Sequence, residues 1–434
     1  MITQEQKQAY KALLKEQIAL IKKVSKKSKI TNLAVLIIDV FLILGLFFGF
    51  IGIDLIKRGI SSEKVVFYLY LDVFIYLVSM TTHVIIHETG HLVFGLISGY
   101  KFQSFRIFSL AFVKENGRIQ RKKLSIKGMA GQCLMSPPDK DKDGRFPFIL
   151  YNLGGGLANL IISLPFFVAA VYKDNALAAS ILIGFSSSGL ILAFTNLIPM
   201  DLGIQNDGMN IKGMLRHEII RESFYLQLML NAEMSNGKLI TDYNPDLFTV
   251  PDDQDTYKYA LAAYNYLYTY YRYLAGHDFE SAYDCLTKIL EKAESFPIFI
   301  LNTLQLEQLF FMVLHHRPAE EIASLYKRVR LILKADKTDI NIQRINYIYE
   351  ALLTEEEKKD IMTLITKKVP KKWVKCDLDK FRENIEKIAK SYPVSGEAVM
   401  NLDIIDYCLR KFNTSQDENR PADQNDSITT QNDE

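Results

Sequence analysis

The sequence predicts a mainly α-helical, polytopic membrane protein with four transmembrane helices, a small cytoplasmic β-hairpin loop and a C-terminal cytosolic domain of α-helical repeats. Three observations indicate this fold class. Long apolar runs are confined to the first half of the 434 residues, and a strongly basic loop separates the second run from the third. The second half instead has the sequence of a soluble helical protein, with successive helix pairs.

Residues 1–30 are predicted to form a cytosolic amphipathic helix. The helix ends in a lysine cluster made of Lys22, Lys23, Lys26, Lys27 and Lys29. This cluster places the N-terminus in the cytoplasm by the positive-inside rule. The lysines have two interpretations, a solvated run that only sets the topology or a group that docks on anionic lipid headgroups.

The transmembrane core is expected within residues 31–210. Four apolar segments there are long enough to cross about 30 Å of hydrocarbon, namely 32–56, 65–99, 146–172 and 176–199. The second segment exceeds one straight span, so we expect it to tilt, kink or project into the cytoplasm. The loop after it contains Lys101, Arg106, Lys114, Arg118, Arg121, Lys122, Lys123 and Lys127. These charges place the loop on the side of the N-terminus, and an even number of spans returns the C-terminal half to the cytoplasm.

The second apolar segment contains the motif His87-Glu88-Thr89-Gly90-His91. On a helix, residues four apart lie one turn apart on the same face, so both imidazoles can reach one metal ion. Glu88 lies beside them, where a zinc peptidase has the general base that activates water. Ionisable groups at bilayer depth are costly and usually functional, which makes the motif more specific.

A catalytic zinc ion needs a third protein ligand and an open position for water. The fourth apolar segment runs toward the cytoplasm and ends at Pro199, which Gly203 and Gly208 follow. We expect these three residues to interrupt a helix there. Irregular backbone at membrane depth is tolerated where protein or water surrounds it. Asp207, directly before Gly208, can therefore supply a carboxylate at the depth of the two histidines.

These motifs resemble those of the site-2 protease family of intramembrane zinc metallopeptidases. The resemblance covers about residues 65–210 and rests on three places, which are His87–His91, Gly155–Asn159, and the run from Asn196 to Pro199 that leads to Asp207-Gly208. It implies a Zn²⁺ cofactor, a catalytic base at Glu88, and metal ligands at His87, His91 and Asp207.

The sequence departs from the family pattern in two places. Gly156 replaces the proline that usually follows the first glycine of the middle motif. The stretch from Asn196 to Asp207 is a few residues longer than usual, so Asp201 is a rival third ligand. We favour Asp207 because a glycine follows it, as in the family. The family's asparagines are thought to steady the substrate or the site, which implies these roles for Asn159 and Asn196.

Other polar residues of the spans have structural and functional interpretations. Asp39 and Asp72 can hydrogen-bond between helices or line a proton or ion pathway. His83 lies one turn before His87 and within reach of the same metal. We expect it instead beside the ligands or against another helix, because three protein ligands are sufficient.

The basic loop, residues 101–144, is predicted to contain the hairpin. Apolar and polar residues alternate around 105–112, and Asn116-Gly117 follows, which is a hairpin signal. In relatives, β-structure beside the catalytic helices is thought to guide or gate the substrate, and an exposed edge strand can pair with an unwound segment. The four scattered cysteines predict unpaired thiols. We expect Cys133 to be a packed thiol rather than a ligand.

The second half is expected to have three parts. Residues 211–255 form an amphipathic helix, along or below the membrane, and a turn-rich linker. Residues 256–412 resemble a short tetratricopeptide-like solenoid, with one persuasive repeat at Gly276, Ala282, Leu286 and Ile289. Such stacks display a concave surface for partners. The polar tail, residues 413–434, is expected to be disordered.

The sequence therefore indicates a zinc-dependent intramembrane endopeptidase. Its expected substrate is a membrane-spanning protein or a membrane-associated peptide precursor, and its expected location is the cell (cytoplasmic) membrane, with both termini in the cytoplasm. The repeats would bind a cytosolic protein, and no basic motif with interleaved aromatics suggests nucleic acid. One alternative is a catalytically inactive membrane scaffold that acts through its repeats. Another is a transporter that uses Asp39, Asp72 and the histidines, although no internal duplication supports it.

Overall fold

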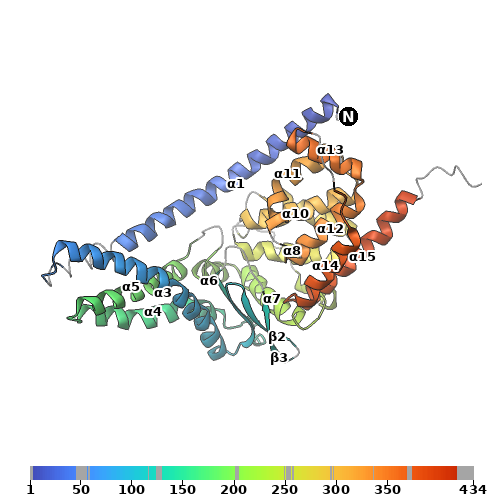
Figure 1. Ribbon diagram of the computed structural model, residues 1–434. Helices are drawn as coiled ribbons and strands as arrows, with labels where there is room; N and C mark the ends of the chain where they lie inside the picture. The colour runs from blue at the N-terminus through green and yellow to red at the C-terminus, as the bar shows by residue number, and fades with distance from the viewer. Residues whose placement is uncertain are drawn as a thin grey trace, which may run out of the picture.

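The computed structural model of the protein describes residues 3–44, 56, 59–115, 117–123, 130–200, 205–248, 250, 256, 259–293, 296, 298–335, 337–368 and 374–417. Figure 1 shows a bundle of long helices at one end of the molecule and a larger group of shorter helices at the other. A small β-sheet lies between these regions, together with α6 (Asp207–Arg216) and α7 (Glu218–Met234). The candidate site is at this junction.

Three described helices are long and apolar enough to cross a membrane: α3 (Ser62–Ile97), α4 (Phe148–Val171) and α5 (Ala176–Leu197). Their bounds agree closely with the predicted second, third and fourth spans, and the three helices pack against one another. The first predicted span, 32–56, falls partly outside the described residues. The number of four spans therefore stays a prediction.

Helix α1 (Gln4–Leu44) continues without a break past residue 30, where we expected the N-terminal helix to end. Its N-terminal half packs on α11 (Ala319–Ala335), where Tyr10 is buried and Ser324 Oγ donates a hydrogen bond to Gln17 Oε1 over 2.9 Å. The same helix also contacts α5. It thus connects the C-terminal helices with the membrane helices, as Figure 1 shows.

The loop after α3 forms a four-stranded antiparallel sheet rather than a simple hairpin. The strands, in the spatial order β3-β2-β1-β4, are β3 (Arg118–Lys123), β2 (Leu110–Glu115), β1 (Lys101–Ile107) and β4 (Gly131–Ser136). Glu115 of β2 pairs with Arg118 of β3, and Gly117 between them has a positive φ of 78°, as a tight hairpin turn requires. Asn116 lies outside the described residues. The expectation of a hairpin was incomplete because β4 pairs with β1 across 23 intervening residues and lacks an alternating pattern of its own.

Two helices follow α5, where we expected one amphipathic stretch. They are α6 (Asp207–Arg216) and α7 (Glu218–Met234), separated at His217, whose backbone is extended. We had expected Gly208 to interrupt a helix. It lies instead in the first turn of α6. A Cβ at Gly208 would lie 2.4 Å from the carbonyl oxygen of Leu197, so its small size allows α6 to begin against the end of α5.

The C-terminal region consists of eight α-helices within the described residues. They are α8 (Ala260–Ala275), α9 (Phe279–Glu291), α10 (Ile298–Leu314), α11, α12 (Ile340–Leu352), α13 (Glu355–Thr366), α14 (Leu378–Ser391) and α15 (Ser395–Asp417). Two short 3₁₀ turns, Ile240–Asp242 and Pro245–Leu247, precede them. Helix α15 extends into the expected disordered tail, whose remaining residues are outside the described ranges. The likeness to tetratricopeptide repeats stays a prediction.

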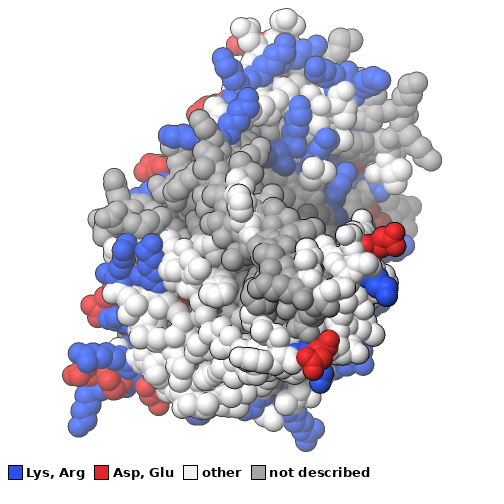
Figure 2. Space-filling model, turned by 90° about the vertical axis from the view of Figure 1, so that its left-hand side faces the viewer, with Lys and Arg blue, Asp and Glu red and all other residues white. Residues whose placement is uncertain are grey.

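Charged side chains are unevenly distributed over the face shown in Figure 2. The lower part of this face, where the membrane helices lie, has a broad uncharged centre. Large apolar side chains of α3 are exposed, among them Phe67 and Leu77. Lys and Arg gather in the upper part, and the described α1 lysines, such as Lys11 and Lys15, are exposed. This division fits an apolar lipid-facing surface beside a basic surface in water.

Candidate metal centre

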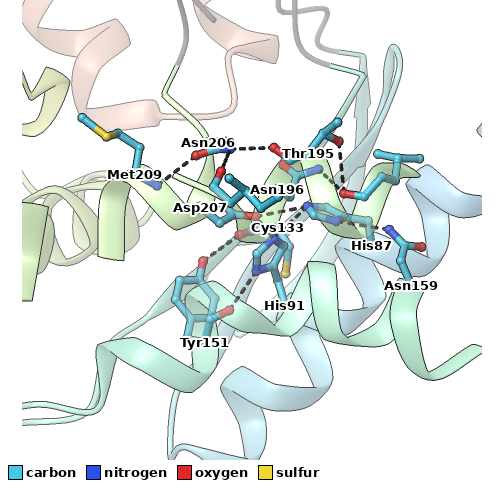
Figure 3. A network of polar contacts seen from close by, with 12 residues as sticks. His87, His91, Cys133, Tyr151, Asn159, Thr195, Asn196, Asn206, Asp207 and Met209 are labelled. Carbon is cyan, nitrogen blue, oxygen red and sulfur yellow. Dashed lines mark hydrogen bonds and ion pairs between the residues drawn. The ribbon is translucent and has the colours of Figure 1, made fainter. Parts of the chain in front are cut away.

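His87, Glu88 and His91 lie on the face of α3 that is buried against the rest of the protein. Each is 8% exposed. Their helical spacing brings the Nε2 atoms of His87 and His91 to 3.1 Å from each other. Asp207, in the first turn of α6, directs its carboxylate to the same point, and its Oδ2 is 3.4 Å from each Nε2. Figure 3 shows the three side chains converging from two helices far apart in sequence.

Asn206 holds the start of α6 against the end of α5. Its side-chain NH₂ donates to the carbonyl oxygens of Thr195 and Ile198 at 2.6 and 2.7 Å. Its Oδ1 accepts from the backbone N–H of Met200 and of Met209 at 3.1 and 2.9 Å. As the N-cap of α6, Asn206 thereby fixes the position of Asp207. The rival ligand Asp201 lies outside the described residues.

The group of ligand atoms fits a zinc ion. A tetrahedral zinc site with bonds of roughly 2.0–2.1 Å separates its ligand atoms by about 3.3 Å, close to the separations among these three atoms. The buried Oδ2 of Asp207 accepts no hydrogen bond within the described part of the chain. A Cβ at Gly155 would lie 2.6 Å from both Nε2 atoms, so this glycine leaves room at the centre of the group.

Electrostatics keep the Asp207 carboxylate ionised. Burial raises the pKa of this carboxyl, but the positive charge that the neighbouring imidazoles of His91 and His87 carry when protonated outweighs burial and holds the pKa well below its usual range. The imidazole of His91 is oriented by a backbone acceptor, because its Nδ1 lies 2.8 Å from the carbonyl oxygen of Tyr151. A carbonyl can only accept, so Nδ1 carries a proton whether the ring is charged or neutral, and a metal ion would take the place of the second proton, on Nε2.

The model of peptidase family M50 matches residues 75–349, more than half of the chain. The chain belongs to peptidase family M50. Members of this family are membrane-embedded zinc metallopeptidases, although some are inactive. The match begins within α3 and ends within α12, so it extends well beyond the region that carries the motifs. No curated protein and no solved structure matches the chain.

The candidate metal centre of this M50 chain opens into a cavity of about 560 Å³. Glu88 and the three candidate ligands line it, together with the first four residues of β4, and with Asn196. The backbone of β4 lies directly against Glu88, since a Cβ at Gly131 would be 2.4 Å from Glu88 Oε1. An extended edge strand, a carboxylate and the candidate ligands therefore share one cavity.

Arg106 of β1 holds this end of the sheet. We had placed it among the basic residues that set the topology, but its side chain is 2% exposed. Its guanidinium donates to the carbonyl oxygens of Phe108 and Gly131 at 2.9 and 3.3 Å. Burial lowers the pKa of Arg106, and the nearby Glu88 carboxylate opposes this shift. Arg106 differs from the other basic residues of the loop in being buried, and the local sequence does not reveal this burial.

The two predicted support residues have different surroundings. The Nδ2 of Asn159 is 3.4 Å from Nδ1 of His87, so Asn159 contacts a candidate ligand. Asn196 Nδ2 donates to the carbonyl oxygen of Leu192 at 2.9 Å within its own helix, and Asn196 lines the cavity. Cys133 is buried in the cavity wall, and burial with the nearby Glu88 charge raises its thiol pKa to about 12. The thiol is not among the grouped ligand atoms of the described residues.

Proposed function

We propose that this M50 chain is a zinc-dependent intramembrane endopeptidase that cleaves a transmembrane or membrane-associated peptide segment, in regulated proteolysis or precursor processing. One observation carries the proposal, namely the convergence of His87 Nε2, His91 Nε2 and Asp207 Oδ2 beside Glu88. We assign the first three residues as metal ligands and Glu88 as the catalytic base.

When bound, zinc would polarise the scissile carbonyl group and lower the pKa of a water molecule in its open position. Glu88 takes the proton of the attacking water and passes it to the leaving amine. The wall formed by Gly131 and Arg106 confines the Glu88 carboxylate to the cavity, which favours a single orientation for this transfer. Asn159 steadies His87, and Asn196 is available to a substrate in the cavity.

The substrate reaches this cavity as an extended chain, because a helix hides its carbonyl groups. Strand β4 supports such a mode, since it is an edge strand within the described sheet and its residues line the cavity beside Glu88. The apolar surface of α3, α4 and α5 supports contact with lipid and with membrane-spanning substrates. We infer a cell-membrane location with cytoplasmic termini, and a cytosolic partner for the C-terminal helices.

The test replaces the proposed base in the full-length protein. Glu88→Gln should keep a zinc content equal to that of the wild type but lose cleavage, because the amide cannot take a proton. Glu63→Gln, in the first turn of the same helix, is the matched control and should retain both. Membrane peptides from cells that express each variant are compared by mass spectrometry, and zinc is measured on the purified proteins. Equal peptide patterns and equal cellular function with Glu88→Gln would instead favour an inactive scaffold.

A further inference from the structure

His83 lies one turn before His87 but does not approach the candidate metal centre. It is completely buried at the contact of three membrane helices. Its Nε2 is 3.0 Å from the carbonyl oxygen of Phe185 in α5, and its Nδ1 is 3.1 Å from the side-chain amide of Asn159 in α4. The other end of that amide is 3.4 Å from Nδ1 of His87. A continuous polar chain therefore runs from Phe185 through His83 and Asn159 to His87.

The direction of this chain follows from which groups can donate. The Phe185 carbonyl can only accept, so Nε2 of His83 carries the proton, and Nδ1 of a neutral His83 can only accept. In the structure Oδ1 of Asn159 faces His83 and Nδ2 faces His87. The donor rule assigns the reverse orientation, with the NH₂ group toward His83 and the oxygen toward His87. The oxygen and nitrogen of an amide are nearly equal in size, so a half-turn about the Cβ–Cγ bond exchanges them without steric cost.

The half-turn determines what His87 can bind. With the Asn159 oxygen facing it, Nδ1 of His87 carries the proton and Nε2 has a free lone pair toward Asp207 and His91. With the NH₂ group facing it, Nδ1 must accept, the proton moves to Nε2, and His87 cannot ligate a metal. We propose that His83 is a positioning residue that sets the amide of Asn159 and, through it, the metal-binding tautomer of His87. This inference rests on the proposed zinc site.

The packing around His83 holds its imidazole ring in one position beside Asn159. A Cβ at Gly189 in α5 would lie 2.3 Å from Cε1 of His83 and 1.9 Å from Oγ of Ser163 in α4. The ring of His83 also lies against Phe185, with centroids 4.5 Å apart. Asn159 and Ser163 are both fully buried. The imidazole thus has little freedom to move away from Asn159, and the absence of a side chain at Gly189 makes room for it.

The test is a double-mutant cycle on zinc affinity in the full-length protein, measured by competition with a chromogenic chelator. His83→Phe should lower the affinity about 10–100-fold, the usual effect of losing a partner that orients a metal-binding histidine. In the Asn159→Asp background the same change should have little effect, because a carboxylate presents an oxygen to His87 in either orientation. Ser163→Ala, which removes one atom from the same packed region, is the control and should keep the affinity.

The cycle separates positioning from packing. If His83→Phe lowers the zinc affinity equally in the wild-type and Asn159→Asp backgrounds, His83 acts only by filling space. If it does not lower the affinity even where Asn159 is intact, His83 has no role at the site. Either result overturns the inference. Should His83→Phe fail to fold, His83→Gln and His83→Leu replace it. The glutamine can accept and donate, so only the leucine variant should lose affinity, and equal affinities overturn the inference.

The same measurements distinguish this inference from the proposed function. If the wild type binds zinc and His87→Ala does not, the metal site stands whatever the cycle gives. If the wild type and His87→Ala bind zinc equally, both the site and the role of His83 are rejected.

Discussion

Gly90 of α3 and Gly154 of α4 face each other backbone to backbone. A Cβ on Gly90 would lie 2.3 Å from the carbonyl oxygen of Gly154, and a Cβ on Gly154 would lie 2.7 Å from that of Gly90. This contact lies between the two histidines' helix and the helix that carries Gly155 and Asn159. The close approach of the two backbones therefore sets the width of the candidate metal centre.

Gly90→Ala should separate these helices. The new methyl group meets backbone atoms, which cannot rotate away, so we expect a loss of about 1–3 kcal/mol of stability, typical of overpacking. Zinc affinity should also fall, because His87 and His91 move away from Asp207. Thermal unfolding in detergent and chelator competition measure the two effects. Gly276→Ala is the control, since a Cβ there lies 3.4 Å from its nearest atom, and a variant Gly90→Ala with the wild-type Tm would contradict the prediction.

Asp207→Ala should abolish stoichiometric zinc binding, because it removes one of three converging ligand atoms. Asp201→Ala should leave zinc binding unchanged, which makes it both the control and the direct test of the rival ligand. Zinc content after dialysis against a weak chelator distinguishes the two. Loss of zinc in Asp201→Ala with retention in Asp207→Ala would reverse the assignment.

The membrane helices were predictable because a span needs a continuous apolar run, and such a run is visible in sequence alone. The predicted range 176–199 and the observed Ala176–Leu197 differ by two residues at one end. The motif and its position also predicted which side chains would converge, since His87 and His91 share a helix face and Asp207 follows a span that ends at the same depth. Their role as zinc ligands stays a prediction.

Other parts of the site depend on contacts that no local pattern encodes. The hydrogen-bond acceptor for His91 is the backbone carbonyl of Tyr151. Every residue has such a carbonyl, so the residue type at position 151 could not have predicted this contact. Strand β4 exists because it pairs with β1, and its proximity to Glu88 depends on the packing of the sheet on α3. The four hydrogen bonds of Asn206 reach residues up to 11 positions away. Only the hint of an N-cap before Asp207 could have drawn attention to it.

Asn206→Ala should loosen the attachment of Asp207. It removes the helix cap and the two donated bonds that tie α6 to α5, and each such bond contributes about 1 kcal/mol. We expect zinc affinity to fall at least about tenfold, the effect of 1.4 kcal/mol. Asn206→Asp keeps the acceptor for Met209 but not the donors, so its affinity should be intermediate. Equal affinities for the wild type and Asn206→Ala would show that other contacts position Asp207.

The stability of the C-terminal helices should depend on pH through Glu397. Burial raises the pKa of this carboxyl to about 7, against the opposing hydrogen bond from Asn341, and the charge of Asp339 adds to the increase. An unfolded glutamate has a pKa of about 4.3, so the folded state binds this proton more tightly. The folded state is therefore favoured at low pH, and stability falls as the pH rises from roughly 4.3 toward 7.

Glu397→Gln should remove this dependence, because an amide keeps the hydrogen bond from Asn341 and never ionises. At pH 8 the variant should be more stable than the wild type by on the order of 1–3 kcal/mol, whereas at pH 4 the two should be nearly equal. Tm of the full-length protein in detergent, measured across this range, provides the test. Glu383→Gln, on the exposed face of α14, is the control and should follow the wild-type curve. Parallel curves for the wild type and Glu397→Gln would mean that folding does not change the pKa of the Glu397 carboxyl, which contradicts the prediction.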